Sequence, residues 1–188
     1  MTLAYNFLLL PHKALPLYLF KRVLLGLVCS LSLNAHPHIF IDIKLIPDVE
    51  KVTIVWTFDA MTSAMLIGDY DKNKDKQLSA EEIAIIDKEH FKTLAPYSYF
   101  MRFFDGKNEN EVTHTQNFHA TIEKKRLVYS FSIPTLANKS YELRFFDPEM
   151  YVAMILKKEG LVCSKHFTCK TQGYDADFYY AYKAIIAP

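Results

Sequence analysis

Apolar and polar residues alternate along much of the chain beyond position 38. In the segment 39–45 every odd-numbered residue is Ile or Leu, as expected of a strand with one buried face. Further strands are predicted at residues 52–58, 97–105, 112–122, 127–133, 141–146, 151–156 and 161–169. Turn signals such as Pro47-Asp48 and Asp105-Gly106 separate them. Six to eight short strands of this kind predict a mainly antiparallel β-sandwich.

A helical unit interrupts the strands at about residues 60–94. Apolar residues recur there at helical spacing, for example Met61 and Met65, and later Ile83 and Ile86. The predicted fold class is therefore α+β, a β-sandwich with an inserted EF-hand-like helix–loop–helix. The aromatic segment 174–186 is open between a last strand, a tail helix and a docking segment.

The loop between the two predicted helices has the spacing of a calcium site. Counted from Asp71, oxygen-bearing side chains fall at positions 1, 3, 5, 9 and 12, which is the pattern of an EF-hand loop. Calcium prefers oxygen ligands, including a backbone carbonyl at position 7 and a bidentate Glu at position 12. The predicted ligands are Asp71, Asn73, Asp75, the carbonyl of Gln77, Ser79 and Glu82.

One position of this loop departs from the pattern. Position 6 calls for Gly at positive φ, but the residue here is Lys76, and a non-Gly residue in that conformation costs about 1–2 kcal/mol. We therefore expect weak calcium binding, with a dissociation constant on the order of 10⁻⁴–10⁻³ M. The alternative is that Ser79 and Glu82 only form a capping box at the start of the second helix. In either case the expected role is structural.

Composition and charge point to an exported protein. The chain has 188 residues, is 51% hydrophobic and has a net charge of +1, which argues against nucleic-acid binding. Residues 1–35 contain no acidic residue and place Lys21-Arg22 before the apolar run 23–33. This pattern predicts a signal peptide cleaved after Ala35, which leaves one exported β-rich domain at 36–188. The alternative is an uncleaved membrane anchor.

The cysteines agree with export. Loss of Cys29 with the signal peptide leaves the pair Cys163 and Cys169, six positions apart. A hairpin brings such a pair within disulfide reach, and an oxidising compartment favours the bond. The alternative is a metal site formed by the two thiolates and His166, although this spacing is not that of a zinc knuckle.

Cleavage after Ala35 would begin the mature protein with His36-Pro37-His38. Residues two apart on a strand share a face at roughly 6.5–7 Å, so both imidazoles can reach one ion, with the new α-amine as a further ligand. Nitrogen ligands suit zinc, nickel, cobalt or copper. Asp42 lies on the same face but further along the strand. The alternative is a pair of exposed histidines at a frayed terminus.

Four segments resemble one protein family. They are 36–42 (HPHIFID), 56–59 (WTFD), the loop 70–82 and 146–152 (FDPEMYV). In this order they are similar to the ZevA-like family of poorly characterised periplasmic proteins that accompany nickel/cobalt-type permeases. The likeness extends from His36 to about Cys169. It implies an accessory role in zinc, nickel or cobalt transport with an inner-membrane permease as partner. The family commonly has Gly where this chain has Lys76.

Two other functions compete with that interpretation. One is a calcium-stabilised interaction module of the cell envelope without transition-metal chemistry. The other is a hydrolase, but the sequence contains no Gly-x-Ser-x-Gly elbow, no His-Glu-x-x-His and no phosphate-binding loop. We therefore expect a protein that is not an enzyme.

Overall fold

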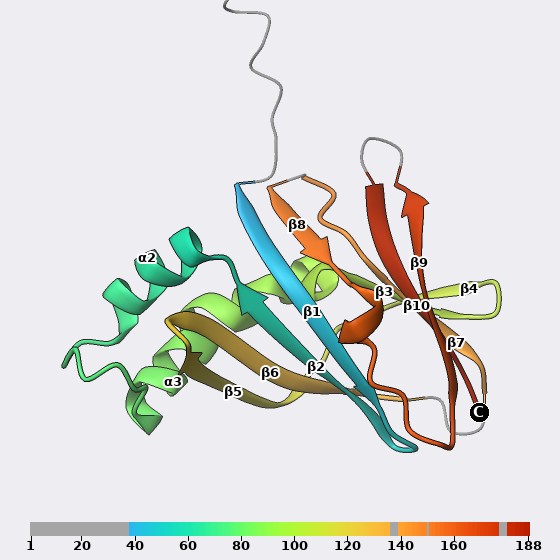
Figure 1. The fold of residues 1–188 in the computed structure, drawn as a ribbon, viewed down its shortest axis with the longest axis horizontal. Helices are drawn as coiled ribbons and strands as arrows, with labels where there is room; N and C mark the ends of the chain where they lie inside the picture. Colours follow the sequence, from blue (N-terminus) through green and yellow to red (C-terminus); the bar gives the residue numbers. More distant parts are fainter. Residues whose placement is uncertain (1–37, 136–138, 150, 177–179) are drawn as a thin grey trace, which may run out of the picture. The chain divides into compact units, whose positions relative to one another are not determined.

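The computed structural model describes residues 38–135, 139–149, 151–176 and 180–188 (Figure 1). The predicted signal peptide at 1–35 and residue His36 lie outside the described residues. The strands in these described ranges are β1 (Ile39–Pro47), β2 (Lys51–Phe58), β3 (Met101–Asp105), β4 (Asn108–Glu111), β5 (Gln116–Glu123), β6 (Arg126–Pro134), β7 (Tyr141–Phe145), β8 (Val152–Ile155), β9 (Thr168–Asp175) and β10 (Tyr180–Ala187). Within the described residues, no helix is long and apolar enough to cross a membrane.

The strands form two sheets of five (Figure 1). The first sheet has the order β5-β6-β2-β1-β8, and the second has the order β4-β3-β7-β10-β9. Neighbours pair antiparallel except β1 and β8, which are parallel, with Ile39 opposite Val152. Buried side chains from both sheets make one hydrophobic core. The prediction of a β-rich α+β fold with a mainly antiparallel two-sheet framework is confirmed.

The alternation of the first strand is also confirmed. Ile41, Ile43 and Leu45 of β1 are buried, whereas Asp42 and Lys44 between them are exposed. Strand β2 continues the same inner face with Val52, Ile54, Trp56 and Phe58. Because successive side chains of a strand point to opposite faces, these residues all reach the core.

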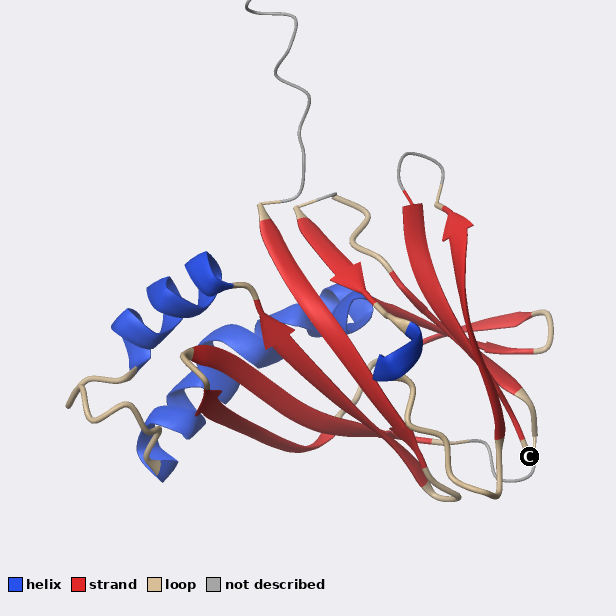
Figure 2. Ribbon diagram, viewed as in Figure 1, coloured by secondary structure: helices blue, strands red, loops and turns tan. Residues whose placement is uncertain are grey.

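The helical unit follows β2, as predicted, and is seen clearly in Figure 2. Helix α2 (Ala60–Tyr70) is joined by a loop to α3 (Ala80–Ile86). The chain then continues through a π-helical turn, η1 (Asp87–Phe91), and the 3₁₀ segment η2 (Lys92–Phe100). Phe91 at the end of η1 is fully buried and packs its ring against Trp56 and Phe131.

The buried face of α2 differs from the one that its methionines suggest. Met61 and Met65 are 72% and 57% exposed, whereas Thr62, Ser63 and Leu66 face the protein. The reason is a pair of hydrogen bonds. The Ser63 hydroxyl donates to the carbonyl of Phe58 and accepts the amide of Leu127 in β6. The small polar side of the helix therefore rests on the sheet.

Two predicted strands begin later than expected. The segment 97–105 is a strand only from Met101, because the 3₁₀ segment η2 with Pro96 precedes it and Ser98 and Tyr99 adopt left-handed backbone angles. The prediction of a strand at 161–169 was wrong for most of its length. Leu161 makes one isolated bridge to Leu45, and β9 starts only at Thr168.

Two other predicted segments have different bounds in the structure. The predicted strand 112–122 is β5, which starts at Gln116 and is preceded by the separate short strand β4. Most of the described residues in the segment 174–186 are in strands, in agreement with the last-strand alternative. This segment supplies the end of β9 and most of β10, which lies between β7 and β9 in the second sheet.

Candidate functional site

The N-terminal end of β1 is the place where distant signature segments meet. The amides of His38 and Ile39 both donate to the carbonyl of Tyr151, at 2.9 and 3.1 Å. Strand β8 then runs parallel to β1 from Val152 onward. The described residues 38–42 and 151–152, which belong to signature segments far apart in the sequence, are therefore neighbours in space. The sequence alone did not show this contact.

A buried carboxylate holds the β8 side of this region. Asp147 is only 2% exposed, and its Oδ2 accepts the amides of Tyr151 and Val152, both at 3.0 Å. Its Oδ1 accepts the amide of Glu149 at 2.9 Å. Asp147 therefore organises the turn that precedes β8. The carboxylate fixes the peptide whose carbonyl receives the start of β1.

A second carboxylate holds the other side. Asp59 is the N-cap of α2, where its Oδ1 accepts the amides of Met61 and Thr62 at 2.8 and 2.9 Å. Its Oδ2 accepts the Thr62 hydroxyl at 2.6 Å and the amide of Phe40 in β1 at 3.0 Å. Burial disfavours the charged form of Asp59, but these hydrogen bonds outweigh it and lower its pKa to about 2. Asp59 is therefore ionised at neutral pH and ties α2 to β1.

His38 directly precedes β1, and its amide bonds to the carbonyl of Tyr151. Its side chain is exposed, and its ring centroid lies 6.2 Å from that of Tyr151. His36, the other predicted transition-metal ligand, lies outside the described residues. Within the described residues, no three His, Cys, Asp or Glu side chains are grouped to hold a metal ion. Asp42 pairs with Lys157 at 3.2 Å, so its carboxylate is engaged away from the terminus.

The predicted calcium loop joins α2 to α3. Glu82 is 8% exposed and closes the loop, since its Oε1 accepts the amide of Lys72 at 2.8 Å and its Oε2 accepts that of Ser79 at 2.9 Å. These bonds lower the pKa of Glu82. The Ser79 hydroxyl oxygen in turn accepts the backbone amide of Glu82, so the predicted capping box is present.

The other predicted ligands lie in the middle of the loop. Asp75 Oδ1 accepts the amide of Gln77 at 2.8 Å, and its Oδ2 accepts the side-chain amide of Asn73 at 2.9 Å. Lys76 has φ of +66°, the conformation that its position in the pattern requires. Lys74 also has a positive φ, of +60°. The loop therefore makes its turn without glycine.

Asp71 differs from the other acids of the loop. It is 4% exposed, and its Oδ2 accepts the amide of Lys76 at 3.0 Å. Its Oδ1 is buried and has no hydrogen-bond partner. Asp71 directly follows the last residue of α2. Its Oδ1 is therefore a buried carboxylate oxygen, at the start of the loop, that has no hydrogen-bond donor.

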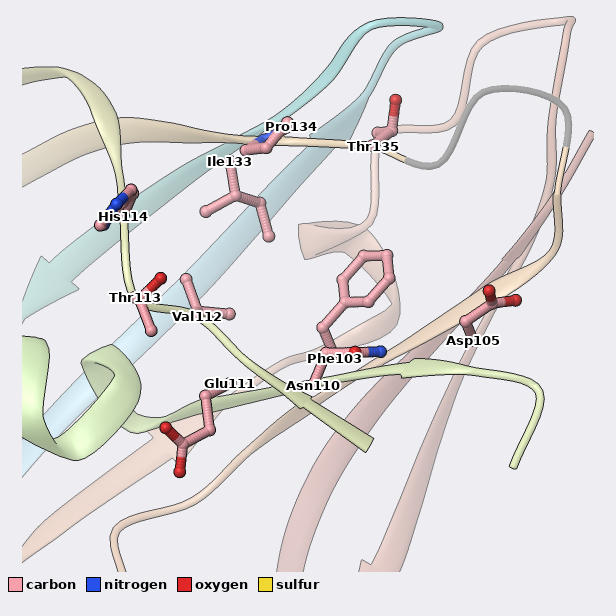
Figure 3. Close-up of a pocket in the computed structure, with 10 residues that line it drawn as sticks. All are labelled: Phe103, Asp105, Asn110, Glu111, Val112, Thr113, His114, Ile133, Pro134 and Thr135. Carbon is pink, nitrogen blue, oxygen red and sulfur yellow. The ribbon is translucent and has the colours of Figure 1, made fainter. Parts of the chain in front are cut away.

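A cavity of about 510 Å³ opens between the two sheets, at a place that no sequence motif indicated (Figure 3). Its apolar lining includes Phe103 of β3, Ile133 of β6 and Val112. The carboxylates of Asp105 and Glu111 point in different directions from its wall (Figure 3). Because its lining comes from several separate segments, no local spacing could reveal this cavity.

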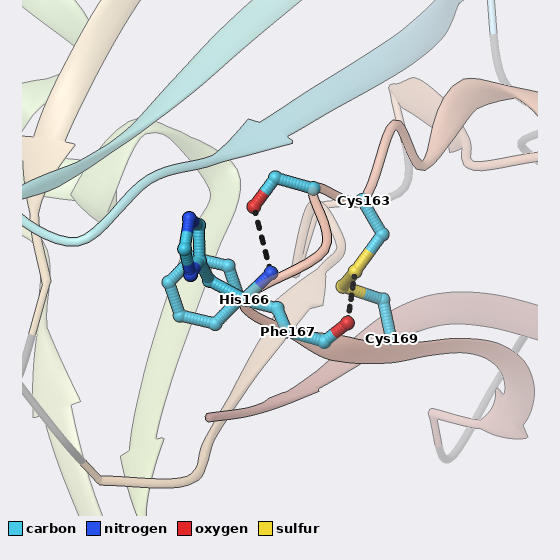
Figure 4. Close-up of a disulfide and its surroundings, with 5 residues drawn as sticks. Cys163, His166, Phe167 and Cys169 are labelled. Carbon is cyan, nitrogen blue, oxygen red and sulfur yellow. Dashed lines mark hydrogen bonds between the residues drawn. A yellow bond between two sulfur atoms is a disulfide. The ribbon is translucent and has the colours of Figure 1, made fainter.

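The cysteine pair forms a disulfide, as predicted (Figure 4). The Cα atoms of Cys163 and Cys169 are 6.0 Å apart, and the turn between them is held by the Phe167 amide bonded to the Ser164 carbonyl. His166 lies in that turn and is exposed. Both sulfurs are used in the bond, so the structure supports the disulfide over a thiolate metal site.

A partly buried histidine of the helical unit has a structural role. His90 in η1 lies with Nδ1 at 3.1 Å from the hydroxyl of Tyr129 in β6. Burial lowers the pKa of His90, so the neutral ring is favoured. His90 therefore packs against Tyr129 of β6.

Comparison with known proteins shows which family the chain belongs to. Residues 22–184 match the family described as "Protein of unknown function (DUF1007)". The chain belongs to this family. An uncharacterised protein of Haemophilus influenzae is 28% identical over 164 residues, covering 80% of this chain and 77% of the relative. An uncharacterised 15.5 kDa protein in the trpE 3' region of Spirochaeta aurantia is 26% identical over 104 residues, covering 53% and 74%.

The DUF1007 match includes every candidate site described above. It begins before β1, contains the loop 71–82 and the disulfide, and ends within β10. The likeness is therefore to the whole two-sheet domain with its helical unit, and not to an isolated motif.

Proposed function

We propose that the protein is a periplasmic accessory component of a zinc, nickel or cobalt transport system. It binds the ion at the N-terminal end of β1 and assists an inner-membrane permease of the nickel/cobalt type. The observation that carries the proposal is the convergence on this strand end. Asp59 accepts the amide of Phe40 in β1, and Asp147 accepts the amide of Tyr151, whose own carbonyl accepts the amide of His38.

The chemistry follows from what a strand end presents. His36 and His38 would share a face at roughly 6.5–7 Å, with the α-amine at His36 as a third nitrogen once residues 1–35 are removed. Three nitrogen ligands suit zinc, nickel or cobalt and leave a position for a ligand from the permease. The anchored backbone at His38 would limit the motion of the ligands and so favour binding.

Export supports the same proposal. The sequence pattern of residues 1–35 predicts cleavage after Ala35, and the disulfide between Cys163 and Cys169 fits an oxidising compartment. Processing would then create the site, because the α-amine exists only in the mature chain.

The test uses processed protein purified from a bacterial periplasm, with its first residue established by mass spectrometry. Calorimetric titration of the metal-free protein with zinc and nickel should give dissociation constants below about 1 µM. The variant His36→Ala/His38→Ala should bind at least about 100-fold more weakly, since it loses two of three ligands.

The matched control is His114→Ala/His119→Ala. Both of these histidines are exposed and lie before or within β5, outside the strand end. The control should bind zinc and nickel like the unmodified protein. If the unmodified protein does not bind these ions, or if the two double variants bind equally, the proposed site is wrong.

A further inference from the structure

The buried oxygen of Asp71 calls for a partner, either a cation or a hydrogen-bond donor. A carboxylate that is removed from water is stable only when it is paired or hydrogen-bonded. Asp71 Oδ2 has the amide of Lys76, but Oδ1 is buried without a hydrogen-bond donor. Because Oδ2 bonds across the loop to Lys76, the carboxylate is turned into the loop and not toward the sheet.

The loop carries negative charge that its own lysines do not neutralise. Asp71, Asp75 and Glu82 alternate with three lysines in the sequence. In the part of the chain that the structure describes, none of these lysines makes an ion pair with a loop carboxylate. All three lysine side chains are exposed. Asp71 and Glu82 are therefore buried in the loop, whereas Asp75 and the three lysines are exposed to water.

We propose that the loop 71–82 binds one calcium ion, at a site separate from the proposed transition-metal site. The oxygens available are those of Asp71, Asn73, Asp75, Ser79 and Glu82 and the carbonyl of Gln77. A ligand set made only of oxygens, three of its groups being carboxylates, suits a hard cation. Zinc and nickel prefer nitrogen or sulfur ligands, which this loop does not offer. Calcium is favoured over magnesium because it accepts six to eight oxygens in a flexible geometry.

The ion has a structural consequence. Asp71 caps the end of α2, and Glu82 lies in the first turn of α3. An ion bound by both carboxylates joins the two helices through oxygens that now bond only to loop amides. The helix pair is therefore stabilised by calcium, and the ion takes no part in transport chemistry.

Thermal unfolding and calorimetry of the processed protein test this. Calcium at 10 mM should raise the unfolding temperature by roughly 3–10 °C, given a dissociation constant on the order of 10⁻⁴–10⁻³ M. Asp71→Asn should remove most of that shift and weaken calcium binding at least tenfold. Asp75→Asn is a second variant, at an exposed position where folding is not at risk, and should act in the same direction.

The matched control is Asp69→Asn, the same change at an exposed acid of α2 just outside the loop. It should keep the full calcium shift, as should His36→Ala/His38→Ala, so failure here is distinct from failure of the proposed function. The proposal is overturned if calcium produces no shift, if magnesium produces an equal one, or if Asp69→Asn and Asp71→Asn lose the shift alike. Calcium binding without zinc or nickel binding would support this site and identify a calcium-stabilised envelope module.

Discussion

The loop 71–82 and the start of β1 are both organised by carboxylates, but over different distances along the chain. In the loop, each hydrogen bond joins residues at most ten positions apart, the longest being that from Lys72 to Glu82. The start of β1 is held by Asp59, nineteen positions from Phe40, and by the β8 segment that Asp147 fixes. The first region is a local motif, whereas the second exists only in the folded domain. Substitutions in the second should therefore cost more stability.

The largest expected effect is that of Asp147→Ala. The change leaves the amides of Glu149, Tyr151 and Val152 without an acceptor, and an unsatisfied buried donor costs about 1–3 kcal/mol. Since only one of these three hydrogen bonds is fully buried, we expect the free energy of unfolding to fall by roughly 2–4 kcal/mol, as measured by urea denaturation. Asp147→Asn retains one acceptor oxygen and should lose about half as much.

An intermediate effect is expected from Asp59→Asn, and it depends on pH. The folded pKa of about 2 lies below the ordinary value of 3.8, so the ionised group contributes stability above about pH 4. That contribution is lost as pH falls through 2. Because Asp59 is partly exposed, we discount it for solvent screening to about 1 kcal/mol.

The measurement is urea unfolding of both proteins at pH 5 and near pH 2. The unmodified protein should lose about 1 kcal/mol more than Asp59→Asn over this interval. Asp48→Asn is the control, because among the described residues the carboxylate of Asp48 accepts only the amide of its neighbour Val49. Parallel pH curves for Asp59→Asn and the unmodified protein would show that Asp59 does not tie α2 to β1.

The same contrast explains what the sequence could predict. The alternation in β1, the capping box of Ser79 and Glu82 and the left-handed conformation at Lys76 are local, so spacing alone predicted them. The buried face of α2 was not predictable. The Ser63 hydroxyl finds its partners in β2 and β6, and this places Met61 outside. The contact of His38 with Tyr151 required the parallel pairing of β1 with β8, which no local pattern encodes.

The smallest effect separates backbone conformation from charge within the loop. Lys76→Gly removes the cost of a left-handed non-Gly residue, about 1–2 kcal/mol, but gives the unfolded chain about 0.4–1 kcal/mol of extra conformational freedom. The expected net gain in the free energy of unfolding is about 0.5 kcal/mol, measured by urea denaturation. The calcium dissociation constant should fall roughly two- to fivefold, because one nearby positive charge is lost.

Lys76→Gln distinguishes the two causes. It removes the charge but retains the side chain at φ of +66°, so calcium should bind as tightly as to Lys76→Gly while the stability without calcium stays unchanged. If Lys76→Gly instead lowers stability without calcium, the left-handed residue is already held at no cost by its amide bond to Asp71. The loop would then depend on its own hydrogen bonds as firmly as the start of β1 depends on Asp147.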